Sequence, residues 1–445
     1  KDLLVQVYYN LGNTYEDISE NDLALDAYKK SISLAEKLND EDMIGKNNRS
    51  IGMIMMNLGQ LDKSLDYCKQ HMKHFIKSNN KSELGIVSGN IGAIYLHQGK
   101  LDEAYKFFEK QVNISKALDS KQSLQMALGN IALIKNIKGE YQSAIAKFDE
   151  ILIICEDIND RMSICNTLGN IGIGYKNIGE YDKAIKQYES QLLIARKSNY
   201  KKNICSANTN LGVAYYHKGN FDRAQIYYEN SEHLISEIND KNEESMLYGN
   251  KGILYVDMGE FDLALEQYNK SYDIFSSIDN IRGKALVDFE KSKILYYKNN
   301  FEEAKKEIVK SSSIFEQIGD LPNFSKSMIL YAKINRELKQ LDDASAIINK
   351  AYEAASKINS EHLANESKVE REIITMYKNN NSDTLLSYTV NKNLDLSEEV
   401  LAYIHFNLFM YAKIDSSKVI ALKLYKHLYK NFPKYLYKSY IDILS

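Results

Sequence analysis

Residues 89–104 read GNIGAIYLHQGKLDEA, and closely similar stretches return at intervals of forty residues or multiples of forty. The copies include GNIGIGYKNIGEYDKA at 169–184, TNLGVAYYHKGNFDRA at 209–224 and GNKGILYVDMGEFDLA at 249–264. The spacing runs without insertion or deletion through nine copies, from Asn10 to Leu330. A fixed period of roughly 20–50 residues indicates an array of stacked units rather than several unrelated domains.

Each unit is predicted to be a pair of antiparallel helices. Ile91, Ile94 and Tyr95 recur at helical spacing in the first half of the unit. Gly99 suits a left-handed helix end because it has no Cβ, and Asp102 then lies near the positive end of the next helix dipole. One such pair cannot bury its apolar face alone, so neighbouring pairs have to stack.

These residues resemble the tetratricopeptide repeat (TPR). The family pattern has two small and two aromatic positions, and Gly92, Ala104, Tyr95 and Phe108 match them. The usual tryptophan is missing throughout, and the unit is longer than the common length of about thirty-four residues. Such long units are similar to LGN, kinesin light chain and bacterial signalling TPR regions. The resemblance implies an all-α fold, a right-handed α-solenoid (TPR superhelix) of antiparallel helix pairs.

We expect three parts along the chain. Residues 1–360 hold nine forty-residue TPR units, and residues 361–400 hold a degenerate helical pair. Residues 401–445 hold a last TPR-like pair with a capping helix, which covers the face that the end of a stack would otherwise expose.

Composition excludes several classes of protein. The net charge of −3 disfavours a dedicated nucleic-acid binder, which normally carries a basic stripe. No apolar run reaches the roughly 18 residues that a membrane span needs. The four cysteines follow no metal-binding or disulfide spacing, which indicates reduced thiols and a cytoplasmic location. Because the sequence starts at Lys1 and not at a methionine, the alternative that a signal peptide has been removed stays open.

No catalytic motif is present, so we expect neither an enzyme nor a bound cofactor or metal. The phosphate-binding GxxxxGK[ST], the zinc-binding HExxH and the hydrolase GxSxG patterns are absent. Cys68, His71 and His74 lie three residues apart, but they spread over about 120° of a helix surface. We interpret them as one buried thiol and two surface histidines.

The asparagine that precedes the core isoleucine or leucine of each first helix is the main candidate for binding. In a TPR stack the first helices line the concave groove, and the resemblance implies that this asparagine contacts the backbone of a peptide ligand. Its carboxamide both donates and accepts hydrogen bonds. The alternative is that the asparagine bonds the backbone of a neighbouring repeat. The predicted groove residues are Asn90, Asn130, Asn170, Asn210, Asn250, Leu96, Met126, Leu133, Ile173, Lys176, Val213, Tyr216, Met246 and Ile253.

The ends of this groove carry basic residues, namely Lys46, Arg49, Lys293, Lys333 and Arg336. We therefore expect a protein or peptide partner that presents an amphipathic segment with acidic flanks. The apolar groove also leaves self-association open, through a helix of a second copy.

Two functional interpretations remain from the sequence. The first is a protein–protein interaction scaffold that binds a partner segment in the groove. The alternative is the sensor region of a larger signalling ATPase, cyclase or defence protein whose effector domain lies outside this chain. A quorum-peptide receptor is disfavoured, because the N-terminal helical bundle or helix-turn-helix of such receptors is not found. Fold alone does not choose among these functions.

Overall fold

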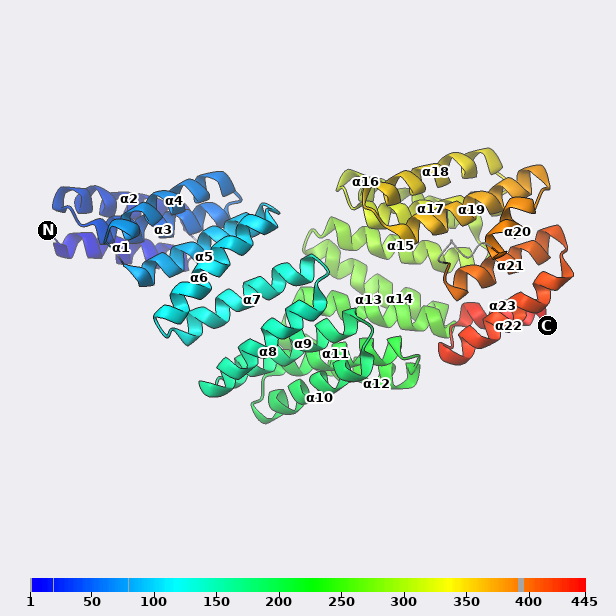
Figure 1. The fold of residues 1–445 in the computed structure, drawn as a ribbon, viewed down its shortest axis with the longest axis horizontal. Helices are drawn as coiled ribbons and strands as arrows, with labels where there is room; N and C mark the ends of the chain where they lie inside the picture. The colour runs from blue at the N-terminus through cyan, green and yellow to red at the C-terminus, as the bar shows by residue number, and fades with distance from the viewer. Residues whose placement is uncertain (1, 19, 79, 391–395) are drawn as a thin grey trace. The chain divides into compact units, whose positions relative to one another are not determined.

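The computed structural model describes residues 2–18, 20–78, 80–390 and 396–445, and in these ranges the chain forms helices joined by short turns (Figure 1). In chain order the helices are α1 (Asp2–Asp17), α2 (Asn21–Leu38), α3 (Glu41–Asn57), α4 (Leu61–Ser78), α5 (Lys81–His97), α6 (Leu101–Ala117), α7 (Lys121–Ile137), α8 (Tyr141–Asp157), α9 (Arg161–Asn177), α10 (Tyr181–Lys197), α11 (Lys201–His217), α12 (Phe221–Ile238), α13 (Lys241–Met258), α14 (Phe261–Ser277), α15 (Ile281–Tyr297), α16 (Phe301–Gln317), α17 (Leu321–Glu337), α18 (Leu341–Lys357), α19 (Glu361–Asn379), α20 (Asp383–Val390), α21 (Glu398–Ala412), α22 (Asp415–Asn431) and α23 (Tyr435–Leu444).

The chain divides into two compact units, unit 1 (Lys1–Tyr200) and unit 2 (Lys201–Ser445). Within each unit, successive helices pack as pairs, from α1 with α2 to α9 with α10 and from α11 with α12 to α17 with α18. The expected all-α solenoid of helix pairs is confirmed. The sequence-based division at residues 360 and 400 stays a prediction, and residues 391–395 of its second part lie outside the described residues.

Left-handed residues end the helices at a spacing of about twenty. Gly99 closes α5 with a φ of 73°, as expected, while Asn159 closes α8 with a φ of 53°. Glycine and asparagine are the residues that adopt this conformation most easily. Some of the following helices begin with a side-chain cap, as where Asp160 accepts a hydrogen bond of 3.1 Å from the Ser163 backbone N–H, whereas α6 after Gly99 has none.

Complementary sizes hold the two helices of a pair together. A Cβ built on Gly172 of α9 would stand 2.4 Å from Cε1 of Tyr188 on α10. The Tyr188 ring therefore occupies the space that a side chain would need, and Ala184 and Tyr188 are both fully buried. In unit 2, the ring of Tyr228 packs against Gly212 in the same way.

Odd-numbered helices line the inner side of each unit. Residues of α3 lie close to residues of α5, and residues of α5 to residues of α7; in unit 2 the helices α11, α13, α15 and α17 approach one another in the same way. Among the described residues, even-numbered helices of neighbouring pairs approach one another less. Helices on the inside of a curved stack are the closer ones, so the odd-numbered helices form the concave face.

Candidate interaction surfaces

Three asparagines of unit 1 stand at the same position on the successive inner helices α5, α7 and α9. Asn170 is exposed, and Asn90 and Asn130 are half-buried. In the described part of the chain, none of the three carboxamides forms a hydrogen bond with another residue. Buried asparagines behave differently: Asn47 donates to the Met43 carbonyl at 2.7 Å. The three amides therefore keep both their donor and their acceptor groups for a partner.

Apolar side chains stand beside these amides, most of all on α7. Met126, Leu133 and Ile137 are 62%, 44% and 55% exposed, and with Asn130 they share one side of the helix because they follow a spacing of four, three and four residues. Leu96 and Ile173 on the flanking inner helices are half-buried. Ile137 is not among the groove residues predicted from the sequence, although its helical spacing from Asn130 places it on the same side of α7. We call Asn90, Met126, Asn130, Leu133, Ile137, Asn170 and Ile173 the unit 1 inner face.

The corresponding residues of unit 2 divide into open and covered positions. Asn210 and Asn250 are half-buried and, within the described residues, form no hydrogen bond with the chain. Met246 is 58% exposed, while Val213 and Ile253 are half-buried. These positions share the register of the unit 1 inner face, but a further segment of the chain lies on the concave side of unit 2.

That segment, residues 431–440, is here called the C-terminal strap. The ring of Phe432 packs edge-on against the rings of Tyr216 and Phe221, with centroid distances of 5.4 and 5.3 Å. Tyr435 meets Phe261 in the same way at 5.2 Å. Figure 1 shows α22 and α23 (red) beside the ends of α13 and α14 (green). The concave side of unit 2 is thus partly closed by its own C-terminus.

Tyr216 therefore differs from its predicted role in an open groove. Its ring is covered by Phe432, and its hydroxyl donates a hydrogen bond of 2.6 Å to Asp257. Burial raises the pKa of the Asp257 carboxyl. No sequence pattern indicates this contact, because Tyr216 and Phe432 lie more than two hundred residues apart.

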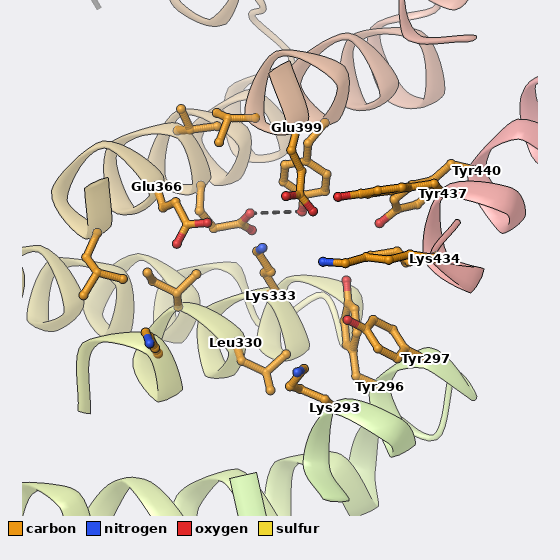
Figure 2. A pocket seen from close by; sticks show the side chains of 18 of the residues that line it. Lys293, Tyr296, Tyr297, Leu330, Lys333, Glu366, Glu399, Lys434, Tyr437 and Tyr440 are labelled. Carbon is orange, nitrogen blue, oxygen red and sulfur yellow. Dashed lines mark hydrogen bonds between the residues drawn. The ribbon is translucent and has the colours of Figure 1, made fainter. Parts of the chain in front are cut away.

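A cavity of about 550 Å³ lies in unit 2 between the inner helices α15, α17 and α19, helix α21 and the strap with α23 (Figure 2). Its polar lining includes four lysines, four glutamates and several tyrosines. The residues are Lys293, Lys326, Lys333, Lys434, Glu290, Glu366, Glu370, Glu399, Tyr296, Tyr297, Tyr403, Tyr425, Tyr437 and Tyr440. We call this space the unit 2 cavity. Lys293 and Lys333 are predicted from the sequence at a groove end, and the structure brings them together with the C-terminal residues.

Comparison with known protein families decides the identity of the repeat. One family model described as tetratricopeptide repeat matches residues 123–197 and 203–277, and a second with the same description matches residues 5–38 and 87–118. The chain is a tetratricopeptide repeat protein. No curated protein matches it in sequence.

Solved TPR structures share the fold at low sequence identity. The quorum sensor NprR from B. thuringiensis is 15% identical with a TM-score of 0.53, over 77% of this chain and 99% of that chain. Aspartyl phosphate phosphatase F from Bacillus subtilis is 17% identical with a TM-score of 0.52, over 71% and 84%. A signal transduction ATPase with a TPR sensor from Pyrococcus horikoshii is 14% identical with a TM-score of 0.53, over 90% of this chain and 57% of that chain. At these identities the likeness concerns the fold alone.

The predicted basic ends of the TPR groove are mostly neutralised within the chain. Lys46 pairs with Asp42 at 2.8 Å, and Arg49 pairs with Glu83 at 2.8 Å. Lys293 pairs with Glu290 at 2.7 Å. Lys333 instead lies over the ring of Tyr403, 4.8 Å from its centroid. In unit 1, half-buried Lys176 forms no ion pair with a described residue, and burial lowers its pKa.

Arg336 is a buried residue rather than a groove residue. Only 2% of its surface is exposed, and its Nε lies 2.7 Å from a Glu370 carboxylate oxygen. The guanidinium also donates hydrogen bonds of 2.8 Å to the hydroxyls of Tyr377 and Tyr403. A buried charge has to be paired in this way, so Arg336 joins α17 to α19 and α21 and offers no charge to a partner.

His71 also differs from expectation, since it is fully buried rather than on the surface. It packs against Phe75 with ring centroids 4.1 Å apart, and burial lowers the pKa of its imidazole to about 3. The four cysteines are buried free thiols. In the ranges that the structure describes, no three histidine, cysteine or acidic side chains gather in a way that would hold a metal ion. None of the described TPR helices is long and apolar enough to cross a lipid bilayer.

Proposed function

We propose that this TPR protein recognises a partner polypeptide, and that the unit 1 inner face binds an apolar segment of that partner. The observation that carries the proposal is the row of Asn90, Asn130 and Asn170, whose amides are unused by the chain and stand beside exposed Met126 and Leu133. Amides of this kind pair with the backbone of a bound segment, and the apolar neighbours bury its side chains.

Acidic flanks are not part of this proposal, because Lys46 and Arg49 already have carboxylate partners in unit 1. An apolar segment in an extended or helical conformation satisfies the inner face without further charge. Two of the similar structures are described as sensors, and that description supports a recognition role for this chain.

The test uses site-specific photo-crosslinking. A photoreactive amino acid replaces Leu133 on the inner helix α7 in one variant and Ile153 on the neighbouring outer helix α8 in the other; the two positions are 44% and 68% exposed. After irradiation in lysate of the source cell, the Leu133 variant is expected to carry a discrete crosslinked protein that the Ile153 variant lacks.

A second variant identifies the role of the amides. The combined substitutions Asn90→Ala, Asn130→Ala and Asn170→Ala are expected to abolish the Leu133 crosslink, whereas Asn113→Ala on the outer helix α6 leaves it unchanged. Circular dichroism checks that each variant stays helical. Equal crosslinking from Leu133 and Ile153, or a crosslink that survives the triple substitution, overturns the proposal.

A further inference from the structure

We propose that the unit 2 cavity binds a small organic anion that carries a phosphate or carboxylate group together with hydroxyl or amino groups. This site is separate from the unit 1 inner face, and the inference is independent of the function proposed above. Its occupant is a molecule of metabolite size, because about 550 Å³ falls within the roughly 300–1,000 Å³ of known small-molecule sites.

Some charges of the cavity are already matched inside the chain. Glu290 pairs with Lys293 at 2.7 Å. Glu370 pairs with the buried Arg336 at 2.7 Å and accepts a hydrogen bond of 3.1 Å from Tyr403. These groups form the walls of the cavity and hold its neighbouring helices together.

Five charged groups remain without an ion pair. Within the described residues, Lys326, Lys333 and Lys434 have no carboxylate within 4.0 Å, and neither Glu366 nor Glu399 has a cationic partner at that distance. Three positive and two negative groups leave 3 − 2 = +1. Figure 2 shows the ammonium groups of Lys333 and Lys434 directed into the same space, with Glu366 and Glu399 also facing it. The lysines favour an anionic group, and the glutamates favour donors elsewhere on the same ligand.

Phenol groups add neutral donors to this lining. Tyr296, Tyr297 and Tyr440 face the cavity in Figure 2, and burial raises the pKa of each hydroxyl, so all three stay protonated at neutral pH. A protonated phenol donates a hydrogen bond to a phosphate or carboxylate oxygen. The rings also offer flat apolar faces to the carbon skeleton of a ligand.

One wall of the cavity comes from the strap. Lys434, Tyr437 and Tyr440 line the space from the C-terminus, opposite Lys293 and Lys333 on the inner helices. A ligand that contacts both walls binds only the closed arrangement, so binding also stabilises the strap in its place.

Isothermal titration calorimetry on the full chain tests this inference with four probes: inorganic phosphate, adenosine monophosphate, glucose 6-phosphate and glutamate. At least one probe is expected to bind the wild type. Binding of the phosphate-containing probes indicates recognition of a phosphate group, and binding of glutamate indicates recognition of a carboxylate group. Lys333→Gln and Lys434→Gln are each expected to weaken that binding about tenfold or more, the loss of one charge-assisted hydrogen bond.

Lys350→Gln is the matched control, since Lys350 is an exposed lysine of α18 outside the cavity. It is expected to bind the probe like the wild type, and circular dichroism confirms the fold of all three variants. The inference is overturned if none of the four probes binds the wild type. It is equally overturned if both cavity variants bind the probe as tightly as Lys350→Gln does.

Discussion

Gly259 lies directly against the ring of Tyr435, so that a Cβ built on Gly259 would stand 2.4 Å from Cδ2 of that ring. One repeat earlier, a Cβ on Gly219 would stand 2.9 Å from the Asn431 carbonyl oxygen. The equivalent turn glycines Gly59, Gly99, Gly139 and Gly179 have no such neighbour within 4 Å. At Gly219 and Gly259, two of these six glycines, the absence of a side chain therefore has two effects. It permits the left-handed backbone of the turn, and it leaves room for the strap.

Substituting asparagine for Gly259 is expected to release the strap without breaking the turn. Asn299 holds the equivalent position one repeat later with a φ of 58°, so asparagine is compatible with this backbone. Its side chain collides with Tyr435, an overpacking that costs about 1–3 kcal/mol. Hydrogen exchange of α23 is expected to become faster in Gly259→Asn.

Gly99→Asn is the control for that experiment, because it makes the same change at a turn with open space around it. It is expected to leave the exchange of α23 as in the wild type. Unaltered protection of α23 in Gly259→Asn would show that the strap contact does not hold this helix in place.

Gly129 and Gly169 occupy the same repeat position but are predicted to respond oppositely to alanine. A Cβ on Gly169 would stand 2.8 Å from Nε2 of buried Gln191, whereas the nearest atom to a Cβ on Gly129 is Cδ1 of Ile151 at 4.0 Å. Gly129→Ala is expected to stabilise by up to about 1 kcal/mol through helix propensity, and Gly169→Ala to destabilise by about 1–3 kcal/mol. Urea unfolding followed by circular dichroism compares them; equal effects would contradict the packing argument.

Glu370 is predicted to be one of the most sensitive residues of unit 2. Glu370→Leu removes the buried carboxylate partner of Arg336 and leaves its guanidinium with only the less buried Glu337 carboxylate, 3.0 Å from Nη1. Breaking a buried ion pair from one side costs about 3–5 kcal/mol. The double variant Arg336→Met with Glu370→Leu removes both charges and is expected to be more stable than the single variant. Thermal melting of both proteins measures the difference. A single variant with wild-type stability would refute this account of the network.

His71 is predicted to make unit 1 sensitive to mild acid. Burial, with a smaller contribution from the charge of Arg49, lowers the pKa of His71 to about 3, below the usual 6.5 of an unfolded chain. Between those values the unfolded state binds a proton that the folded state does not. The contribution of His71 to the free energy of unfolding is therefore fully present above about pH 6.5. It is lost as the pH drops toward 3, by at most about 1.4 kcal/mol per pH unit.

The check for His71 is a series of urea titrations between pH 7 and pH 4. His71→Gln, which has no titrating ring, is expected to lose less stability over that range than the wild type does. If both proteins lose the same amount, the acid sensitivity comes from other groups.

Much of the fold was readable from the repeat. The turn at Gly99 and the packing of the Tyr188 ring over Gly172 depend on residues within one unit. The same contact of a glycine with a ring therefore recurs at Gly12, Gly92, Gly212 and Gly252. The asparagine row was found for the same reason, since a residue that recurs at one position of successive inner helices, here α5 to α13, faces the same side of the stack.

The strap, the unit 2 cavity and the burial of Arg336 were not readable in this way. Each depends on non-repeating residues of the C-terminal helices, such as Phe432 and Tyr403, that meet inner helices far away in sequence. The burial of His71 was not predicted for a related reason, because it depends on a residue of another helix. His71 occupies the space left by Gly45, which lies in the preceding helix.

By itself, then, the sequence determined the helix pairs, their turns and the inner position of the asparagines, because these follow from contacts between residues near in sequence that repeat every forty residues. Only the tertiary structure decided that Tyr216 is covered, that Arg336 is buried and that Lys333 shares a cavity with Lys434. These outcomes depend on the curvature of unit 2, the sum of many small rotations between repeats, which brings its C-terminus back to its own inner helices.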